Sequence, residues 1–383
     1  MRLSRGIAGF FVYDAGKKDF VFSVFVLALC ISLAVLPSGF EDRMPEASLK
    51  VEGEVLEADN SGMAQHGLVR TGGQMLRVRL LEGPFAGEVV TAYNNLLSKM
   101  ELDKVFQPGD HALMNISVQG NSVVWAGAAD HYRLRAEGVL AGIFLLFLLL
   151  YGGFTGLRAA ISFIFTALCL WKLLVPLLLK GYDPIAVTFA ITATLTAVTI
   201  FLVAGVNRKG LVAFLGALAG LAFTCCLALA FSGPLHVNGA VRPFSETLLF
   251  SGFMHLNLTR IFLAGIFLAA SGAVMDLAID IALALHEIAR HNPAISRLEL
   301  LKSGVIVGRA VIGGMTTTLA LAYSGGYLTL LMLFMGQGVP MQNILNLSYV
   351  SAELLHILAG SFGLVLVAPL TAVIGCVAYA RPR

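Results

Sequence analysis

Four ionisable residues lie inside long apolar runs of the sequence: Asp276, Asp280, Arg309 and Glu353. Charged side chains are costly in hydrocarbon and usually face a protein interior or a water-filled cavity, so each of them marks a potential ion or substrate site. Asp276 and Asp280 are four residues apart, which places them one turn apart on one face of a helix. Two ionised carboxylates at that spacing repel each other, so we expect a proton or a cation to neutralise one of them.

Arg309 is the expected partner of these aspartates, because it lies early in the next apolar run. Gly304 and Gly308 precede it, and small residues let two helices approach each other closely. One interpretation is a structural ion pair between Arg309 and an aspartate that locks two helices together. A second is a proton- or cation-coupled site in which Arg309 is the counter-ion or binds an anionic substrate. A third is that Asp280 or Arg309 simply reaches the cytoplasmic interface.

Further polar residues follow along the last two apolar runs. Thr316 and Thr317 come after Arg309, and their hydroxyls either bond back to their own helix or supply oxygen ligands along a pathway. Gly325 and Gly326 predict a break in that helix, and broken helices expose backbone groups at depth in secondary transporters. Glu353 and His356 are three residues apart at the start of the last run. They are either a gate that faces the outer side or only an interfacial pair.

Several enzyme classes are excluded by spacing. The segment from His286 to His291 has the pattern H-E-x-x-x-H, whereas a zinc protease needs its two histidines four residues apart on one helical face. An intramembrane aspartyl protease presents its aspartates from two helices, and Asp276 and Asp280 share one. The sequence contains no P-loop, Rossmann glycine pattern or nucleophile elbow. We therefore predict no enzyme, no metal site and no cofactor.

The composition indicates a membrane protein. Of the 383 residues, 57% are hydrophobic and 13% are charged, about half the charged share of a soluble domain. Apolar runs long enough to cross a hydrocarbon core recur along the chain. We predict eight spans, of which the seventh is tilted, broken or partly re-entrant: 20–37, 138–155, 157–179, 184–206, 211–232, 261–285, 304–335 and 354–380. The segment 248–260 is either an interfacial helix or the true start of the sixth span.

The basic residues predict the orientation of these spans. Twelve Lys and Arg residues fall on the N-terminal side, against three in the short opposite loops, and basic residues favour the cytoplasmic side. We therefore expect a cytoplasmic segment 1–19, a first span that is an uncleaved signal anchor, an extracytoplasmic segment 38–136, a seven-span membrane domain 137–383 and a cytoplasmic C-terminus.

The extracytoplasmic segment has the pattern of a small β domain. Five stretches with strand-like alternation are separated by turn signals: 49–59, 74–81, 87–94, 111–118 and 122–127. Five short strands at this spacing predict a closed barrel of the OB or a related type. The segment 41–137 contains fourteen acidic and nine basic residues, so nucleic acid, which requires a basic patch, is not an expected partner.

Several strings of the sequence resemble the YibE/F-like family of bacterial multi-spanning membrane proteins. They are GPFAGE from Gly83, YNN from Tyr93, SGAVMDLAIDIALALHEIARHNP from Ser271, GMTTTLALAYSG from Gly314 and GSFGLVLVAPLTA from Gly360. The resemblance implies an α-helical polytopic membrane protein with an inserted OB-like β-barrel, located in the bacterial inner membrane. It implies no mechanism.

These observations lead to two hypotheses about function. The first is an ion- or proton-coupled secondary transporter or channel with its site between the sixth and seventh spans, where Asp276 or Asp280 carries the coupling ion. Its partners are the lipid bilayer and a small ion or small molecule. The alternative is a non-transporting assembly or accessory protein whose β domain docks a protein partner. Neither the substrate, nor the direction of transport, nor the oligomeric state follows from the sequence.

Overall fold

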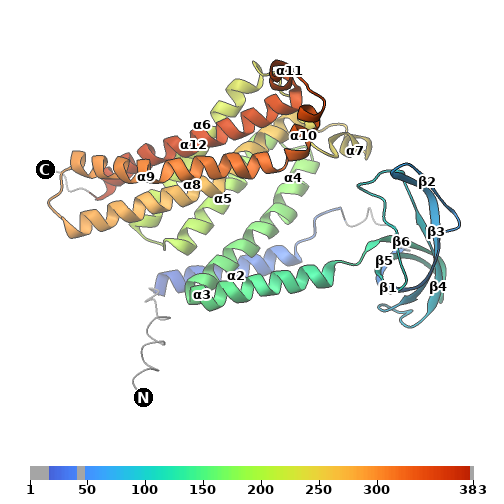
Figure 1. Ribbon diagram of the computed structural model, residues 1–383. Helices are drawn as coiled ribbons and strands as arrows, with labels where there is room; N and C mark the ends of the chain where they lie inside the picture. Colours follow the sequence, from blue (N-terminus) through green and yellow to red (C-terminus); the bar gives the residue numbers. More distant parts are fainter. Residues whose placement is uncertain (1–16, 41–47, 380–383) are drawn as a thin grey trace. The chain divides into compact units, whose positions relative to one another are not determined.

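The computed structural model describes residues 17–40 and 48–379, and they form two compact units (Figure 1). One unit comprises residues 39–147, and the other comprises the chain up to Ser38 together with the chain from Leu148 onward. Arg2, Arg5, Arg381 and Arg383, on which part of the predicted orientation rests, lie outside the described residues, as does residue 380 at the end of the last predicted span.

The smaller unit contains a β-barrel. Its strands are β1 (Ser48–Asp59), β2 (Met63–His66), β3 (Val69–Leu80), β4 (Val89–Asn95), β5 (His111–Gln119) and β6 (Ser122–His131). Five of them close in the order β1-β3-β4-β6-β5-β1, in which all pairs are antiparallel except β4 with β6. The closed five-stranded barrel is thus confirmed, and each of its strands overlaps one of the five predicted stretches, although β3 begins five residues earlier and β6 ends four residues later than predicted. The short β2, which the sequence pattern did not indicate, forms a hairpin with the start of β3.

The barrel core follows from the two-residue periodicity of its strands. Along β3, Leu76, Val78 and Leu80 are fully buried while the residues between them face outward. The core also contains a hydrogen-bonded amide pair, because Asn94 Nδ2 donates to Gln74 Oε1 at 2.9 Å. This pairing meets the requirement that a buried polar group be hydrogen-bonded.

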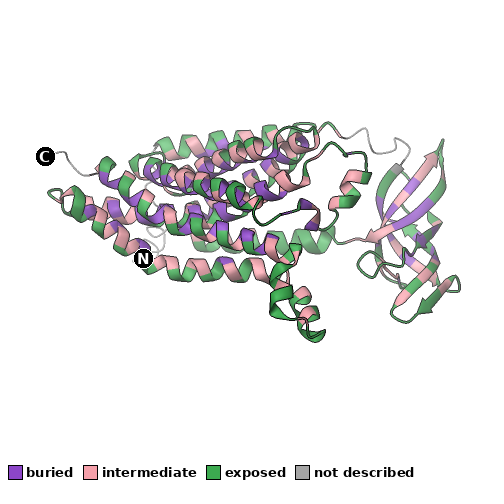
Figure 2. Cartoon of the chain, turned by 90° about the horizontal axis from the view of Figure 1, so that it is seen from above, coloured by how far each residue is buried: buried purple, intermediate pink, exposed green. Residues whose placement is uncertain are grey.

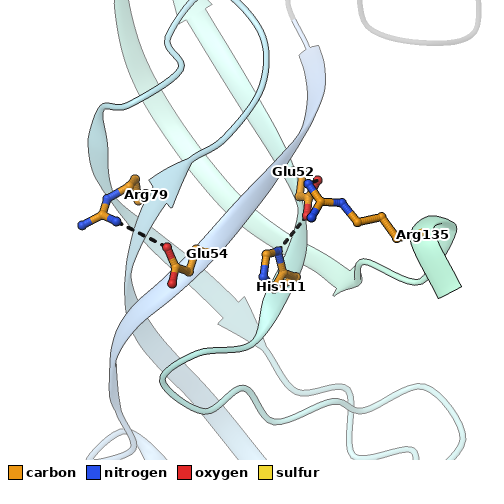
Figure 3. A network of polar contacts seen from close by, with 5 residues as sticks. All are labelled: Glu52, Glu54, Arg79, His111 and Arg135. Carbon is orange, nitrogen blue, oxygen red and sulfur yellow. Dashed lines mark hydrogen bonds and ion pairs between the residues drawn. The ribbon is translucent and has the colours of Figure 1, made fainter.

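An acidic side chain at the barrel wall connects the barrel to the helix that follows it. Glu52 on β1 is fully buried, and its carboxylate oxygens lie 2.7 Å from His111 Nδ1 and 3.0 Å from Arg135 Nη2 (Figure 3). Arg135 is in the first turn of α3 (Leu134–Cys169). The start of α3 is therefore tied to β1 and β5 by a charge-assisted contact.

The larger unit is helical. After α2 (Lys17–Val35) and α3, the elements are a π-helical turn (Leu170–Leu174), α4 (Val175–Leu179), α5 (Pro184–Val203), α6 (Arg208–Ser232), a 3₁₀ turn (Gly239–Val241), α7 (Ser245–Phe250), α8 (Leu258–His291), α9 (Arg297–Gly325), α10 (Leu328–Gly336), α11 (Met341–Asn346) and α12 (Ser348–Tyr379). Among the described residues, seven helices are long and apolar enough to cross a membrane.

The predicted second and third spans form one of these seven helices. The apolar helical stretch Leu134–Leu179 has 46 residues, whereas about 20 residues suffice for one crossing. Gly153 interrupts it with φ 53° and ψ −127°, a conformation that only glycine adopts readily. A Cβ at Gly156 would collide with the carbonyl oxygen of Leu148, so the chain turns back sharply at this point. The boundary predicted between residues 155 and 157 falls beside this turn.

The sixth predicted span has different bounds in the structure, whereas the seventh has the break that was one of its predicted alternatives. The sixth predicted span, 261–285, is shorter than α8, which begins at Leu258, and the short helix α7 precedes it as a separate element. The seventh, 304–335, is divided into α9 and α10 by a break at Gly326 and Tyr327. Hydropathy alone would join α9 to α10 because both are apolar, and it is the glycine pair that predicted the break.

The core of the helical unit is formed mainly by α6, α8 and α12. Figure 2 shows buried residues gathered within the helical bundle. Small residues allow the close approach. A Cβ at Gly220 on α6 would lie 3.0 Å from Val367 Cβ on α12. In the same way, a Cβ at Gly308 on α9 would lie 2.8 Å from Ala368 Cβ on α12. These glycines are therefore required by packing.

Candidate functional site

A polar cluster lies where α9 breaks and α12 begins. Glu353 and His356 are on α12, Tyr327 is at the break between α9 and α10, and Arg242 follows the 3₁₀ turn after α6. Three segments distant in the sequence thus meet around one carboxylate. The glycine pair before Tyr327 ends α9, and this break turns the backbone so that the phenol reaches Arg242.

The guanidinium of Arg242 is at the centre of the cluster. Its Nη1 donates to Tyr327 Oη at 2.7 Å, while its Nη2 lies 3.4 Å from Glu353 Oε2 and 3.1 Å from His356 Nδ1. The guanidinium carbon also lies 5.0 Å from the centre of the Phe262 ring, a cation–π distance. Arginine presents several fixed donors and suits this kind of shared contact better than lysine does.

Burial of Glu353 and His356 costs free energy unless their charges stay paired. Glu353 is 7% exposed and His356 is 8% exposed. The His356 ring stacks on Tyr323 with centroids 4.1 Å apart, and its Nδ1 lies 3.7 Å from Glu353 Oε1. Two polar atoms here, His356 Nε2 and Tyr323 Oη, are buried without a hydrogen-bond partner in the described residues. A buried polar atom without a partner is unusual in a native protein and points to a ligand, a water or a functional role.

Two cavities adjoin the cluster. One, of about 430 Å³, is lined by Arg242, Phe262 and His356 together with residues of α7 and the start of α8. The other, of about 220 Å³, is lined by Tyr327 and Glu353 together with residues of α10, α11 and α12. Arg242 and His356 therefore face one cavity and Glu353 faces the other. The arrangement can bind a proton or a cation at the carboxylate, and an anionic group at the guanidinium.

Asp276, Asp280 and Arg309 do not come together as predicted. All three side chains are exposed on the outside of the helical unit. Within the described residues no ion pair joins Arg309 to either aspartate, so the expected intrachain salt bridge is not formed. The shared face of Asp276 and Asp280 on α8 is as the spacing predicts.

The threonines of α9 bond to their own helix. Thr316 Oγ1 donates to the Ile312 carbonyl at 2.9 Å, and Thr317 Oγ1 donates to the Gly313 carbonyl at 3.1 Å. These are the back-bonds that threonine commonly forms in apolar helices. The hydroxyl protons of Thr316 and Thr317 are therefore engaged within α9, which is the first of the two alternatives that the sequence left open.

A second buried charge lies at the opposite end of the bundle. Arg158, close to the start of the predicted third span, is buried, and its Nη1 donates to the Leu202 carbonyl at 2.9 Å. Asp19 Oδ2, at the start of α2, lies 4.0 Å from this guanidinium, and Asp19 Oδ1 accepts from Val206 N–H at 3.0 Å. This contact ties together the start of α2, the turn at Gly153 and the end of α5.

The family model described as YibE/F-like protein matches residues 140–381. The chain belongs to the YibE/F-like family. The match covers the helical half, including the whole of the Glu353 cluster, whereas the similar strings at Gly83 and Tyr93 lie outside it. No curated protein and no solved structure matches the chain.

Sequence reasoning identified only part of the site of this YibE/F-like protein. Glu353 was singled out, and His356 was noted beside it. Arg242 and Tyr327 were missed, because a basic residue in a short loop and a tyrosine after two glycines look ordinary. The available signal was a lone arginine between two apolar runs on the side where basic residues are rare.

Proposed function

We propose that this YibE/F-like protein is an ion- or proton-coupled secondary transporter or channel of the bacterial inner membrane, with the Arg242–Glu353–His356 cluster as its coupling site. The observation that supports this most is a buried carboxylate beside a broken helix, with a cavity on each side. Intramembrane ionisable groups commonly belong to ion pathways and proton relays. Broken helices next to such groups are a feature of secondary transporters.

Protonation of Glu353 is the coupling event in this proposal. While Glu353 is ionised, it holds Arg242, and Arg242 in turn holds Tyr327 at the break between α9 and α10. A proton or cation that neutralises the carboxylate removes this attraction. Arg242 then becomes available to an anionic substrate in the larger cavity, and α10 is released. Such a ligand shifts the equilibrium between two states by its differential affinity for them.

This site replaces the one expected between the sixth and seventh spans. Asp276 and Asp280 are exposed on the outside of the unit, whereas Glu353 faces a cavity. A coupling residue must exchange its ligand with an internal pathway, and only Glu353 meets that condition among the four charges that the sequence singled out.

The proposed topology has eight crossings. The 46-residue stretch counts as two crossings because the chain turns at Gly153. The contact of Asp19 with Arg158 and Val206 then brings the start of α2, the turn at Gly153 and the loop after α5 to one end of the bundle, as alternate crossings require. The basic residues favour the cytoplasm for that end, which leaves the β-barrel outside. A cysteine at Ser61 in the barrel should be labelled by an impermeant reagent before the inner membrane is opened, and labelling only afterwards would refute this orientation.

Transport is tested with the purified full chain in proteoliposomes. Gradients of H⁺, Na⁺, K⁺, Mg²⁺, chloride and phosphate are imposed in turn. We expect at least one of them to produce a current or a pH change. Glu353→Gln should lose it, because the amide binds no proton or cation in the same way. Glu246→Gln, an exposed carboxylate on α7, is the matched control and should retain it. Absence of flux in the wild type, or equal flux in Glu353→Gln, would refute the proposal.

An accessory role remains as a second candidate, because the barrel carries an exposed aromatic surface. Tyr93 pairs across the sheet with Met75 on one side and with Gly127 on the other, and Trp125 covers Gly127. Tyr93, Met75 and Trp125 are each about half exposed. Exposed aromatic patches are typical of partner-binding surfaces. Wild-type protein without ion flux, together with a co-purifying protein lost on Trp125→Ala, would favour this function.

A further inference from the structure

Within residues 17–40 and 48–379, no segment covers one strip of α8. This helix packs against α5, α6, α9 and α12, but Ala269, Gly272, Asp276 and Asp280 follow each other at helical spacing and are all exposed. A Cβ at Gly272 would meet no atom within 4 Å. The strip therefore combines small residues, which permit a close neighbour, with two carboxylates.

The strip lies at the middle of a helix that is long enough to cross the bilayer. At about 1.5 Å per residue, Asp276 is about 27 Å from the first residue of α8 and about 22 Å from the last. If a hydrocarbon core about 30 Å thick is centred on this helix, Asp276 lies about 13 Å inside its nearer edge and Asp280 about 7 Å inside it. Carboxylates at that depth are rarely left facing lipid, so a partner for Asp276 and Asp280 is expected.

The Arg309 side chain is a cation that requires an acidic partner. It lies on the flank of α9 from which it cannot reach Asp276 or Asp280 of the same chain. Arg309, Thr316 and Tyr323 follow at seven-residue intervals, so they share one side of the helix. Tyr323 stacks on His356 of α12, and this contact identifies the side as the one toward α12. The aspartates lie on the other side, on the strip of α8 that α12 does not cover.

The outer face of α9 is open. Gly313 and Gly314 are exposed, and a Cβ at either one would meet no atom within 4 Å. Only Leu300, Gly304, Gly308 and Leu319 are buried among the residues of α9. Glycines on a bare helix face are typical of helix–helix contacts in membranes.

We propose that a second copy of this chain covers this surface and that Arg309 of each copy pairs with Asp276 or Asp280 of the other. A two-fold axis alongside α9 brings the Gly313–Gly314 faces together. Rotation about that axis moves Arg309 of the second copy from the α12 flank to the aspartate flank of the first. Ile281 lies beside Gly308, so Asp280 and Arg309 are at the same height. The contact repeats symmetrically, as a two-fold interface requires. The carboxylate without an arginine takes a proton or a cation.

The charges permit a test that distinguishes interchain pairing from misfolding. In the full chain, Asp280→Arg places two arginines opposite each other across the two-fold, and Arg309→Asp places acidic groups opposite each other. The dimer is measured as energy transfer between labelled copies in liposomes, and in the wild type this transfer should not change when the lipid is diluted. Each variant alone should lose the energy transfer. The two variants mixed before reconstitution should regain it, because each then supplies the charge that the other lacks.

Arg297→Gln, at the exposed start of α9, is the matched control and should leave the energy transfer unchanged. Each variant must also keep its melting midpoint in detergent. Wild-type protein that is monomeric in the membrane would overturn the proposal, because Asp276, Asp280 and Arg309 would then have no second copy to pair with. The proposal would also be overturned if both single variants still formed dimers, or if mixing the two variants did not restore the energy transfer. A different membrane protein that co-purifies on this face, in place of a second copy, would overturn it as well. None of these outcomes depends on ion flux.

Discussion

Arg242→Gln is expected to destabilise the helical unit by about 3 kcal/mol. The substitution leaves Glu353, which is only 7% exposed, without its cation. Removing one member of a buried ion pair costs roughly 3–5 kcal/mol, and we take the lower end because the Arg242 side chain keeps 35% exposure. Its bonds to Tyr327 and His356 are lost as well. At roughly 2–4 °C for each kcal/mol, the melting midpoint should fall by at least about 6 °C.

The double variant Arg242→Gln/Glu353→Gln distinguishes the pair from general damage. Glu353→Gln removes the charge that needs compensation, so the double variant should be more stable than Arg242→Gln alone, with a coupling of at least about 1.5 kcal/mol. The assay is thermal unfolding of the full chain in nanodiscs. Arg290→Gln breaks an exposed pair with Glu287 and should cost less than about 1 kcal/mol. Additive losses in the double variant would refute the ion-pair reasoning.

Three further perturbations test packing, the barrel and a helix cap. Gly308→Ala should lower the melting midpoint because its Cβ would lie 2.8 Å from that of Ala368, whereas Gly142→Ala meets no atom within 4 Å and should not; equal effects would contradict this packing. Glu52→Gln should destabilise the barrel by about 2 kcal/mol, measured by circular dichroism, because a fully buried carboxylate loses two charge-assisted bonds; an unchanged melt would contradict it. Asp183→Ala should cost about 1 kcal/mol through the lost α5 cap. The backbone N–H of Ala186, whose hydrogen bond the Asp183 carboxylate accepts, lowers the pKa of this carboxyl. The stabilisation by the cap should therefore be present above the ordinary aspartate pKa range and disappear as the pH falls through the folded pKa. A stabilisation that is lost as the pH rises would contradict this reasoning.

The sequence predicts the barrel well because its signals are local. Alternation along β3 places Leu76 and Val78 inside, and turn residues separate the strands, so five strands were located to within a few residues. Closure of the barrel was a reasonable expectation from their number. The hairpin strand β2 was missed because Met63–His66 has only four residues, too few for an alternating pattern to be recognised.

Helix boundaries were harder to predict where hydropathy is continuous. Nothing in the apolar composition shows that Gly153 takes a positive φ while other glycines of α3 stay helical. The break at Gly326 was anticipated because two glycines adjoin there. The helix α8 extends beyond the predicted apolar run 261–285 on both sides. At its start, the Asn257 side chain caps the helix by accepting from the Arg260 N–H, so that α8 begins at Leu258.

The site could be predicted only where a residue looked out of place by itself. Glu353 is conspicuous in an apolar run, whereas Arg242 becomes significant only once folding brings it to Glu353 across 111 residues of sequence. The pairing of Arg309 with Asp276 or Asp280 failed within the chain for a related reason. Helical spacing shows which residues share a face, but which faces meet depends on the packing of α8, α9 and α12.

The central claim, in the form in which a proton is the coupling ion, is that Glu353 takes up and releases this proton inside the helical unit. Infrared difference spectroscopy of the full chain in lipid, between high and low pH, reports the C=O stretch of a carboxyl group that becomes protonated. We expect a titrating band from a buried carboxyl in the wild type and in Glu246→Gln, and its absence in Glu353→Gln. A band that persists unchanged in Glu353→Gln, or a wild type without one, would contradict the account.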